Sequence, residues 1–294
     1  MPEVTNHTLH AHGFDFGVRV YPANDPDGSV LVWLHGGAFL WGTIDMPESD
    51  EVAKQVRAAG TTVVAVDYTL GPVEGLPPLP PREDGETGPD PEQVAAEIAA
   101  AGPRSPYPTA SLQTVEAHRW ARENASRWGG DPKRVSLGGA SAGANLSAGA
   151  AVRLRDAGDG LPDSLLLIYP VLHETVPPMD AELAGFLESL PGGGGLPAEA
   201  GRAINEIYFG AVSPTEVYAH PGGHDMRGMP RTLIVTAEHD SLRPSGEAFA
   251  ADLALGGVDV TLLKEPAAQH GYLNEIADPT AAHTIGLMIR TMAD

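Results

Sequence analysis

The 294-residue sequence predicts an α/β fold in which helices cover both faces of a mostly parallel, doubly wound central sheet. Short apolar runs suited to buried strands, such as residues 29–34 and 61–67, alternate with helical patterns along the chain. Several of these runs end in glycine, serine or acidic residues, which are typical of the loops where open α/β sheets bind ligands. The hydrophobic content of 42% suffices for a core, so we expect one domain over residues 1–294.

Charge and composition exclude several classes of partner. The formal net charge is -21, from 39 acidic against 18 basic residues, which disfavours nucleic acid and anionic membranes as partners. The absence of cysteine excludes disulfides, thiolate catalysis and cysteine-based metal sites. No apolar run reaches the roughly 18 residues of a membrane span, and residues 1–6 lack the basic start of a signal peptide. These features predict a cytoplasmic protein.

The first elements are predicted to form an antiparallel hairpin. Residues 5–12 and 16–21 alternate between apolar and polar side chains, and Gly13 separates them. Two nearby histidines, His7 and His10, would face opposite sides of a strand, which favours a solvated edge strand over a metal site. Further along we expect helices at 48–59, 109–128, 144–155, 244–255 and 279–292, and strands at 134–137, 164–169, 232–236 and 260–263.

Two segments interrupt this alternation. Residues 72–108 are rich in proline, glycine and acids and form either a lid or an insertion, with one short helix expected at 91–101. Residues 177–209 contain two helical patterns around a glycine-rich linker at 191–195. Because this second segment lies between two sheet strands, we expect it to form a small helical cap.

The stretch Gly138-Gly139-Ala140-Ser141-Ala142-Gly143 lies between an expected strand and an expected helix. A turn this tight leaves no room for side chains on both flanks of the serine, which explains the two glycines of its G-x-S-x-G pattern. Such an elbow exposes a serine hydroxyl and directs a helix N-terminus toward the ligand. The strand at 29–34 ends in His35-Gly36-Gly37-Ala38, whose bare backbone suits part of an oxyanion hole.

A nucleophilic serine needs a basic histidine and an acid that orients it, in the chain order serine, acid, histidine. Asp240 follows the strand at 232–236, and His270 lies in the loop before the last helix. Glu238 is an alternative acid and His239 an alternative base, although each suits the role less well by its position. The remaining histidines are weaker alternatives, because they precede Asp240 or lie within the last helix: His118, His173, His220, His224 and His283.

Six stretches resemble one family from about residue 30 to the end of the chain. In order they are His35-Gly36-Gly37-Ala38-Phe39, Asp67-Tyr68-x-Leu70-x-Pro72, Gly139-x-Ser141-Ala142-Gly143-x-Asn145-Leu146, Tyr169-Pro170, Leu233-Ile234-Val235-Thr236-Ala237-Glu238-x-Asp240-x-Leu242-Arg243 and His270-Gly271-Tyr272. The chain thereby resembles the bacterial hormone-sensitive lipase-like carboxylesterases of the α/β-hydrolase fold.

The resemblance implies a serine carboxylesterase with Ser141 as nucleophile, His270 as base and Asp240 as orienting acid. It also implies oxyanion donors in the two glycine-rich turns, at Gly36, Gly37, Ala38 and Ala142. The expected partner is a small-molecule ester with a short acyl chain, with no metal or organic cofactor, and a homodimer is possible. An amidase, peptidase or lactonase on the same triad is the alternative, followed by a ligand-binding protein without catalysis.

The sequence also departs from this family. Ala38 replaces a third glycine, and Ala140 stands where an aspartate or threonine is common. Only 34 residues precede His35, and they read as strands rather than as the family's N-terminal cap helices. The segment at 72–108 is foreign to the pattern as well. We therefore expect the cap and the substrate pocket to differ most from those of the family.

Overall fold

The computed structural model describes residues 2–76, 91–190 and 198–293. Within them an eight-stranded sheet has the order β1-β2-β4-β3-β5-β6-β7-β8. Its strands are β1 (Thr5–Ala11), β2 (Phe14–Tyr21), β3 (Val30–Leu34), β4 (Thr62–Asp67), β5 (Val135–Ala140), β6 (Ser164–Ile168), β7 (Arg231–His239) and β8 (Val260–Gln269). β1 and β2 form the predicted antiparallel hairpin, β2 is antiparallel to β4, and all further pairs are parallel. The α/β-hydrolase fold expected from the sequence is confirmed.

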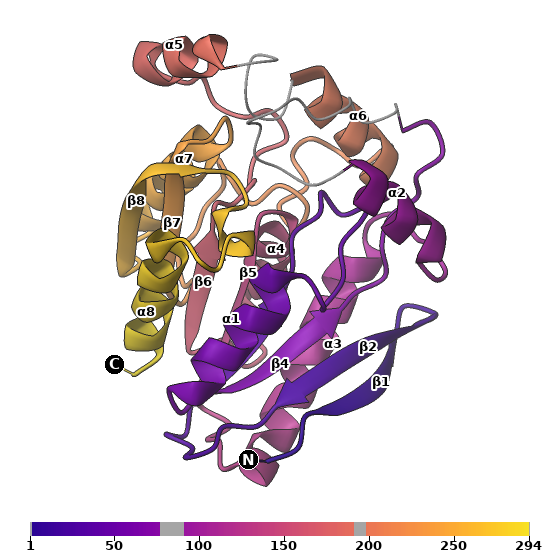
Figure 1. Cartoon of the computed structure of the whole chain (residues 1–294), viewed down its shortest axis with the longest axis vertical. Helices are drawn as coiled ribbons and strands as arrows, with labels where there is room; N and C mark the ends of the chain where they lie inside the picture. Colours follow the sequence, from indigo (N-terminus) through magenta and orange to yellow (C-terminus); the bar gives the residue numbers. More distant parts are fainter. Residues whose placement is uncertain (1, 77–90, 191–197, 294) are drawn as a thin grey trace.

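Helices cover both faces of the sheet (Figure 1). The α-helices are α1 (Pro47–Ala58), α2 (Pro91–Ala100), α3 (Thr109–Asn124), α4 (Ala142–Asp156), α5 (Ala181–Ser189), α6 (Ala198–Tyr208), α7 (Arg243–Leu255) and α8 (Pro279–Ala293). The five residues of β3 are all buried, and alternate ones pack into different clusters. One cluster contains α3, α4 and α7, and the other contains α1 and α8. The period of two along a strand therefore explains why an unbroken apolar run builds two cores.

The histidines of β1 have separate partners. His7 lies with its ring 5.2 Å from that of Trp120, whereas His10 Nδ1 lies 2.7 Å from the carboxylate of Asp15. In the part of the chain that the structure describes, no group of three or more histidines and acids could hold a metal ion.

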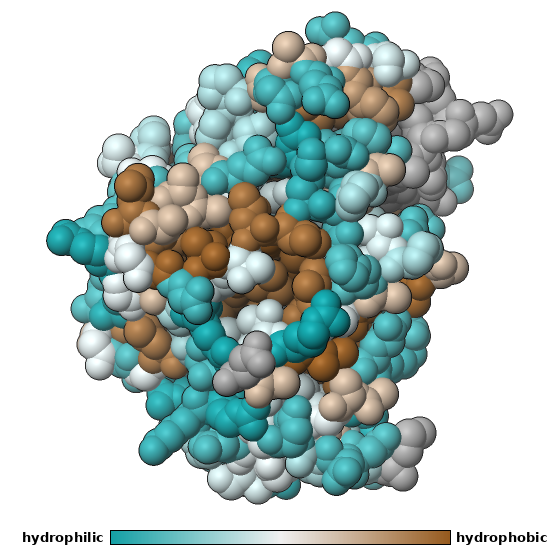
Figure 2. Space-filling view, turned by 90° about the vertical axis from the view of Figure 1, so that its left-hand side faces the viewer, coloured by the Kyte–Doolittle hydropathy of each residue, from teal (hydrophilic) through white to brown (hydrophobic). Residues whose placement is uncertain are grey.

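The last two strands are longer than predicted. β7 extends from Arg231 to His239, and β8 continues for six residues beyond the predicted end at Leu263. The second half of β8 contains Lys264, Glu265 and Pro266, so no apolar run reveals it, and it lies at the edge of the sheet, where polar residues and proline are tolerated. On the side of the molecule that carries β8, apolar side chains gather on the surface (Figure 2).

Three of the helices lie together at one end of the molecule. Figure 1 places α2, α5 and α6 above the central sheet, at the top of the view. The short helix predicted at 91–101 is α2, and the two helices predicted within 177–209 are α5 and α6. The glycine-rich linker at 191–195 and most of the acidic part of 72–108 lie outside the described residues.

Candidate active site

Ser141 occupies a sharp turn between β5 and α4. Its backbone has φ 53° and ψ -116°, a strained conformation for a residue with a side chain. A Cβ on Gly139 would lie 2.4 Å from the carbonyl carbon of Gly143, and one on Gly143 would lie 2.3 Å from the carbonyl oxygen of Leu34. Both glycines are therefore required by close backbone contact. The turn fixes Ser141 beside the end of β3.

Three side chains from distant parts of the chain meet at this turn. The Oγ of Ser141 lies 2.9 Å from Nε2 of His270, and Nδ1 of His270 lies 2.7 Å from a carboxylate oxygen of Asp240. The other oxygen of Asp240 accepts a hydrogen bond of 2.8 Å from the backbone N–H of Leu242. Asp240 follows β7 and His270 follows β8, so neighbouring strands deliver both to one edge of the sheet.

Two opposing effects act on the pKa of His270. Burial disfavours the charged imidazolium, but the charge and hydrogen bond of Asp240 outweigh it and raise the pKa above its usual value. The negative charge of Glu48 acts in the same direction. His270 Nδ1–H can donate to Asp240, which leaves Nε2 free to accept the proton of Ser141.

The alternative acid and base have other contacts. Glu238 accepts a hydrogen bond of 2.8 Å from the backbone N–H of Ala267 and lies 3.0 Å from Nζ of Lys264. The ring of His239 stacks on Phe186 with the ring centroids 3.5 Å apart. Neither side chain reaches Ser141 in any of the contacts recorded for the described residues.

The loop after β3 has an unusual backbone. Gly37, Ala38 and Phe39 all have positive φ values, of 105°, 51° and 66°. For a residue with a Cβ this conformation costs about 1 kcal/mol or more, which explains why glycine is usual where this chain has Ala38. A Cβ on Gly36 would lie only 3.2 Å from Cβ of Ser141, so the loop runs directly beside the serine.

The four expected oxyanion donors are not equivalent. The N–H of Gly36 donates a hydrogen bond of 2.6 Å to Oε1 of Glu48, so this group anchors the loop and is not free for a ligand. The N–H groups of Gly37 and Ala38 donate to no partner among the described residues. Ala142 is the first residue of α4, where an N–H has no acceptor within the helix. Within residues 2–76, 91–190 and 198–293, three of the four candidates therefore keep an unpaired donor next to Ser141.

Sequence reasoning missed Glu48, which it placed at the start of an amphipathic helix. Its side chain is buried and accepts hydrogen bonds from the N–H of Gly36, the hydroxyl of Tyr169 at 2.8 Å and the amide of Asn274 at 3.2 Å. An acidic residue in the first turn of a helix is common at solvent-exposed positions. Nothing local in the sequence distinguishes this buried carboxylate from an exposed one.

Helix α5 is fastened to the loop that carries Asp240. Arg243, three residues after Asp240, is buried and forms an ion pair with Asp180 at the start of α5. His239, the residue before Asp240, stacks on Phe186 of α5. Helix α5 thus contacts residues on both sides of Asp240 in the sequence.

The segment at 72–108 contacts the oxyanion loop. Glu97 of α2 accepts a hydrogen bond of 3.2 Å from the N–H of Gly42, and Arg104 donates one of 2.8 Å to the carbonyl of Leu40. Arg104 also donates to the carbonyl of Gly71, where the chain leaves β4. The described part of the segment at 72–108 therefore packs against the loop after β3, whereas a plain insertion would lie apart from it.

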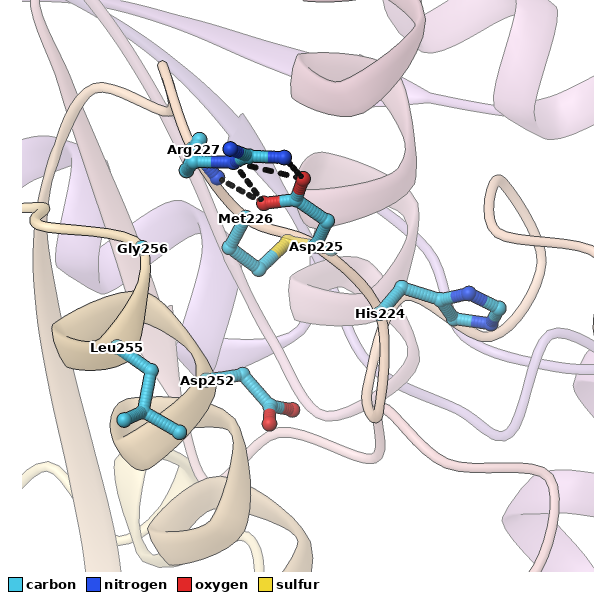
Figure 3. A pocket seen from close by; sticks show the side chains of 7 residues that line it. All are labelled: His224, Asp225, Met226, Arg227, Asp252, Leu255 and Gly256. Carbon is cyan, nitrogen blue, oxygen red and sulfur yellow. Dashed lines mark hydrogen bonds and ion pairs between the residues drawn. The ribbon is translucent and has the colours of Figure 1, made fainter.

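A separate surface pocket of about 330 Å³ lies away from this site (Figure 3). Its seven lining residues are His224, Asp225, Met226, Arg227, Asp252, Leu255 and Gly256. They include no serine, and Figure 3 shows Arg227 paired with its neighbour Asp225. Ser141, Asp240 and His270 do not line this pocket, so it is separate from the site around the serine.

Comparison with known proteins places the chain in a family. A sequence-family profile described as the alpha/beta hydrolase fold matches residues 31–79 and 100–274. Carboxylesterase NlhH from Mycobacterium tuberculosis is 32% identical over 284 residues, which cover 92% of this chain and 76% of NlhH. Ethyl acetate hydrolase from Pseudomonas putida is 26% identical over 272 residues, covering 89% of this chain and 72% of that enzyme.

A solved structure agrees with these matches. The crystal structure of EstE1, a thermostable carboxylesterase cloned from a metagenomic library, has a TM-score of 0.80 and 25% identity to this chain. The match covers 99% of this chain and 88% of EstE1. The resemblance drawn from six sequence motifs is confirmed, and the chain belongs to the hormone-sensitive lipase-like carboxylesterase family of the α/β-hydrolase fold.

Proposed function

We propose that the protein is a serine carboxylesterase in which Ser141 is the nucleophile, His270 the general base and Asp240 the acid that orients it. The observation that carries the proposal is the continuous chain of contacts, 2.9 Å from Ser141 to His270 and 2.7 Å from His270 to Asp240. It runs through a strained turn that holds the serine against the oxyanion loop. Hydrolysis of carboxylic esters is also the activity named for its relatives.

The reaction begins when Oγ of Ser141 attacks the ester carbonyl and its proton passes to Nε2 of His270. The tetrahedral oxyanion accepts hydrogen bonds from the free N–H groups of Gly37, Ala38 and Ala142, each worth about 3 kcal/mol. His270 then gives its proton to the leaving alkoxide as the carbon–oxygen bond breaks. Water, deprotonated by His270, hydrolyses the acyl-enzyme in the same way.

We further propose that the substrate carries a short acyl chain. The two described cap helices are held down by specific contacts, such as Asp180 with Arg243 and the stacked rings of Tyr208 and Phe39, which lie 4.4 Å apart. One relative is named for ethyl acetate, a short-chain ester.

A panel of p-nitrophenyl acetate, butyrate, octanoate and palmitate tests this specificity. We expect kcat/KM to be highest for acetate or butyrate and to show no rise when substrate droplets form. A matched p-nitroanilide of the best acyl group should react at least about a hundredfold more slowly, because the amine leaving group needs stronger protonation. A preference for palmitate, or equal rates on anilide and ester, would contradict the proposal.

The activity should depend on pH through one ionisation. His270 accepts a proton only when neutral, and Asp240 raises its pKa above the ordinary value of 6.5. Activity is therefore lost as the pH falls through this raised pKa and reaches its plateau above it. We expect kcat/KM for p-nitrophenyl acetate to rise through a single limb centred above about pH 6.5. A profile that stays flat from about pH 5 to 8 would exclude His270 as the base.

Two further predictions concern the state of the protein. We propose a homodimer, supported by the edge position of β8, which pairs only with β7 among the described strands, and by the apolar surface on that side (Figure 2). Leu262 of β8 is exposed there. The cytoplasmic location stays a prediction from the sequence.

A further inference from the structure

Glu48 is a buried carboxylate that the proposed reaction does not use directly. Its relative exposure is 2%, although an isolated charge is costly to bury. Two oxygens contact three elements: Oε1 accepts from the N–H of Gly36, and Oε2 accepts from Tyr169 and Asn274. Gly36 belongs to the oxyanion loop, Tyr169 follows β6, and Asn274 lies four residues after His270. The side chain of Glu48 thereby connects the loop that carries Gly36 to the segment that follows His270.

The partners of Glu48 suit an ionised carboxylate. The N–H of Gly36 and the hydroxyl of Tyr169 both donate to it. The amide of Asn274 is oriented by accepting a hydrogen bond of 3.2 Å from the backbone N–H of Glu48, which turns its NH₂ toward the carboxylate. Burial raises the pKa of Glu48 above its usual value, and these three hydrogen bonds offset that rise only in part. The ionised form is the one that this set of donors fits, because a protonated carboxyl would have to donate a hydrogen bond of its own.

Tyr169 connects this charge to the general base. Its hydroxyl binds Glu48, and its ring meets the ring of His270 edge-on with centroids 4.9 Å apart. Among the described residues, Asp240 and Glu48 act on His270 through their charges, Tyr169 contacts its ring, and Tyr272 packs in turn on Tyr169. Both charged groups are carboxylates, and the imidazolium of His270 is the cation that forms near them during the reaction.

We propose that Glu48 is a positioning residue that fixes the oxyanion loop through the N–H of Gly36 and stabilises the imidazolium form of His270 with its charge. The proposal rests on the serine esterase mechanism above. It assigns two separable tasks to one side chain, because the loop contact needs the reach of Glu48 whereas the second task needs only its charge.

Two variants separate these tasks. Glu48→Gln keeps the length and an acceptor for Gly36 but removes the charge. We expect its pH–activity limb to move down by about 0.5 to 1 unit, less than the shift caused by a directly contacting charge. Glu48→Asp keeps the charge but is too short to keep the contact with Gly36. We expect its limb to stay near that of the wild type while its plateau kcat falls about tenfold or more, from the misplaced oxyanion donors.

The matched control is Asp50→Asn, which removes another carboxylate of α1 whose recorded contacts are Tyr21 and Lys54 instead of the site. The rising limb of its pH–activity profile should stay within about 0.2 pH unit of that of the wild type, well below the shift that loss of a nearby charge produces. NMR titration of the His270 ring should give the same order of pKa values without any turnover. This measurement separates the proposal from the esterase assignment, which fails instead if the wild type hydrolyses none of the esters.

If Glu48→Gln leaves both the pH–activity profile and the pKa of His270 unchanged, Glu48 does not stabilise the imidazolium. If Glu48→Asp has the plateau kcat of the wild type, Glu48 does not fix the oxyanion loop. Circular dichroism and thermal melting establish that each variant is folded. If Glu48→Gln does not fold, Glu48→Asp decides alone: a plateau rate and His270 pKa equal to those of the wild type contradict the proposal, and a reduced rate with an unshifted pKa supports it.

Discussion

Replacing Ser141 by alanine should abolish ester hydrolysis and leave the fold intact. Loss of a catalytic serine lowers kcat by about 10⁴- to 10⁶-fold, since no other group supplies the attacking oxygen. Among the described residues the hydroxyl contacts His270, and alanine already occupies a position of similar φ at Ala38. The measurement is kcat on p-nitrophenyl acetate, with circular dichroism and a thermal melt as the test of folding.

The matched control is Ser147→Ala on the same helix. Ser147 is buried and donates a hydrogen bond of 2.8 Å to the carbonyl of Gly143, so its loss costs about 1 kcal/mol of stability. Its activity should remain within a few-fold of the wild type. Esterase activity of the purified Ser141→Ala protein above about 1% of wild type would rule out the mechanism.

Replacing Asp240 by asparagine should lower kcat by about 10⁴-fold, because the amide no longer fixes the tautomer of His270 that can accept a proton. Asp240 is 1% exposed and contacts both His270 and the N–H of Leu242, so the geometry of the loop has little freedom to adapt. The limb of the pH profile should also move to lower pH, since the charge that raises the pKa of His270 is lost.

Glu238→Gln is the control for this assignment. The carboxylate of Glu238 accepts a hydrogen bond from the backbone N–H of Ala267 and pairs with Nζ of Lys264 instead of contacting His270. Its neutralisation should weaken the pairing of β7 with β8 and leave kcat within about fivefold of wild type, as expected of an exposed ion pair. If Glu238→Gln were the severe variant and Asp240→Asn the mild one, the acid would be Glu238.

The meeting of Ser141, Asp240 and His270 in space was predictable because it depends on local sequence patterns. Gly139 and Gly143 are required by backbone contacts within the turn itself, and they flank Ser141 in the sequence. Asp240 and His270 follow apolar runs that had to be neighbouring strands, and parallel strands present their carboxyl ends at one edge. The positions of these residues relative to the predicted strands were therefore enough to predict that their side chains lie together.

Features that depend on packing between distant segments were not predictable. The role of Gly36 changes from a free donor to an anchor because Glu48, twelve residues later, lies beneath the loop. The second half of β8 is a strand through its pairing with β7, although its residues have no strand pattern. The contacts of α5 with His239 and Arg243 depend on a tertiary arrangement that no periodicity in the sequence records.

These α5 contacts bear on how the cap could evolve or be exchanged. Asp180 and Phe186 of the cap complement Arg243 and His239, which belong to the same stretch of main chain as Asp240. A cap segment without an acid at the place of Asp180 and a ring at the place of Phe186 would remove both contacts and leave Glu247, 3.3 Å away, as the one remaining carboxylate partner of the buried Arg243 among the described residues. If α5 covers the substrate as proposed, we expect an exchange of this helix to need matching substitutions at His239 and Arg243, the residues that flank Asp240.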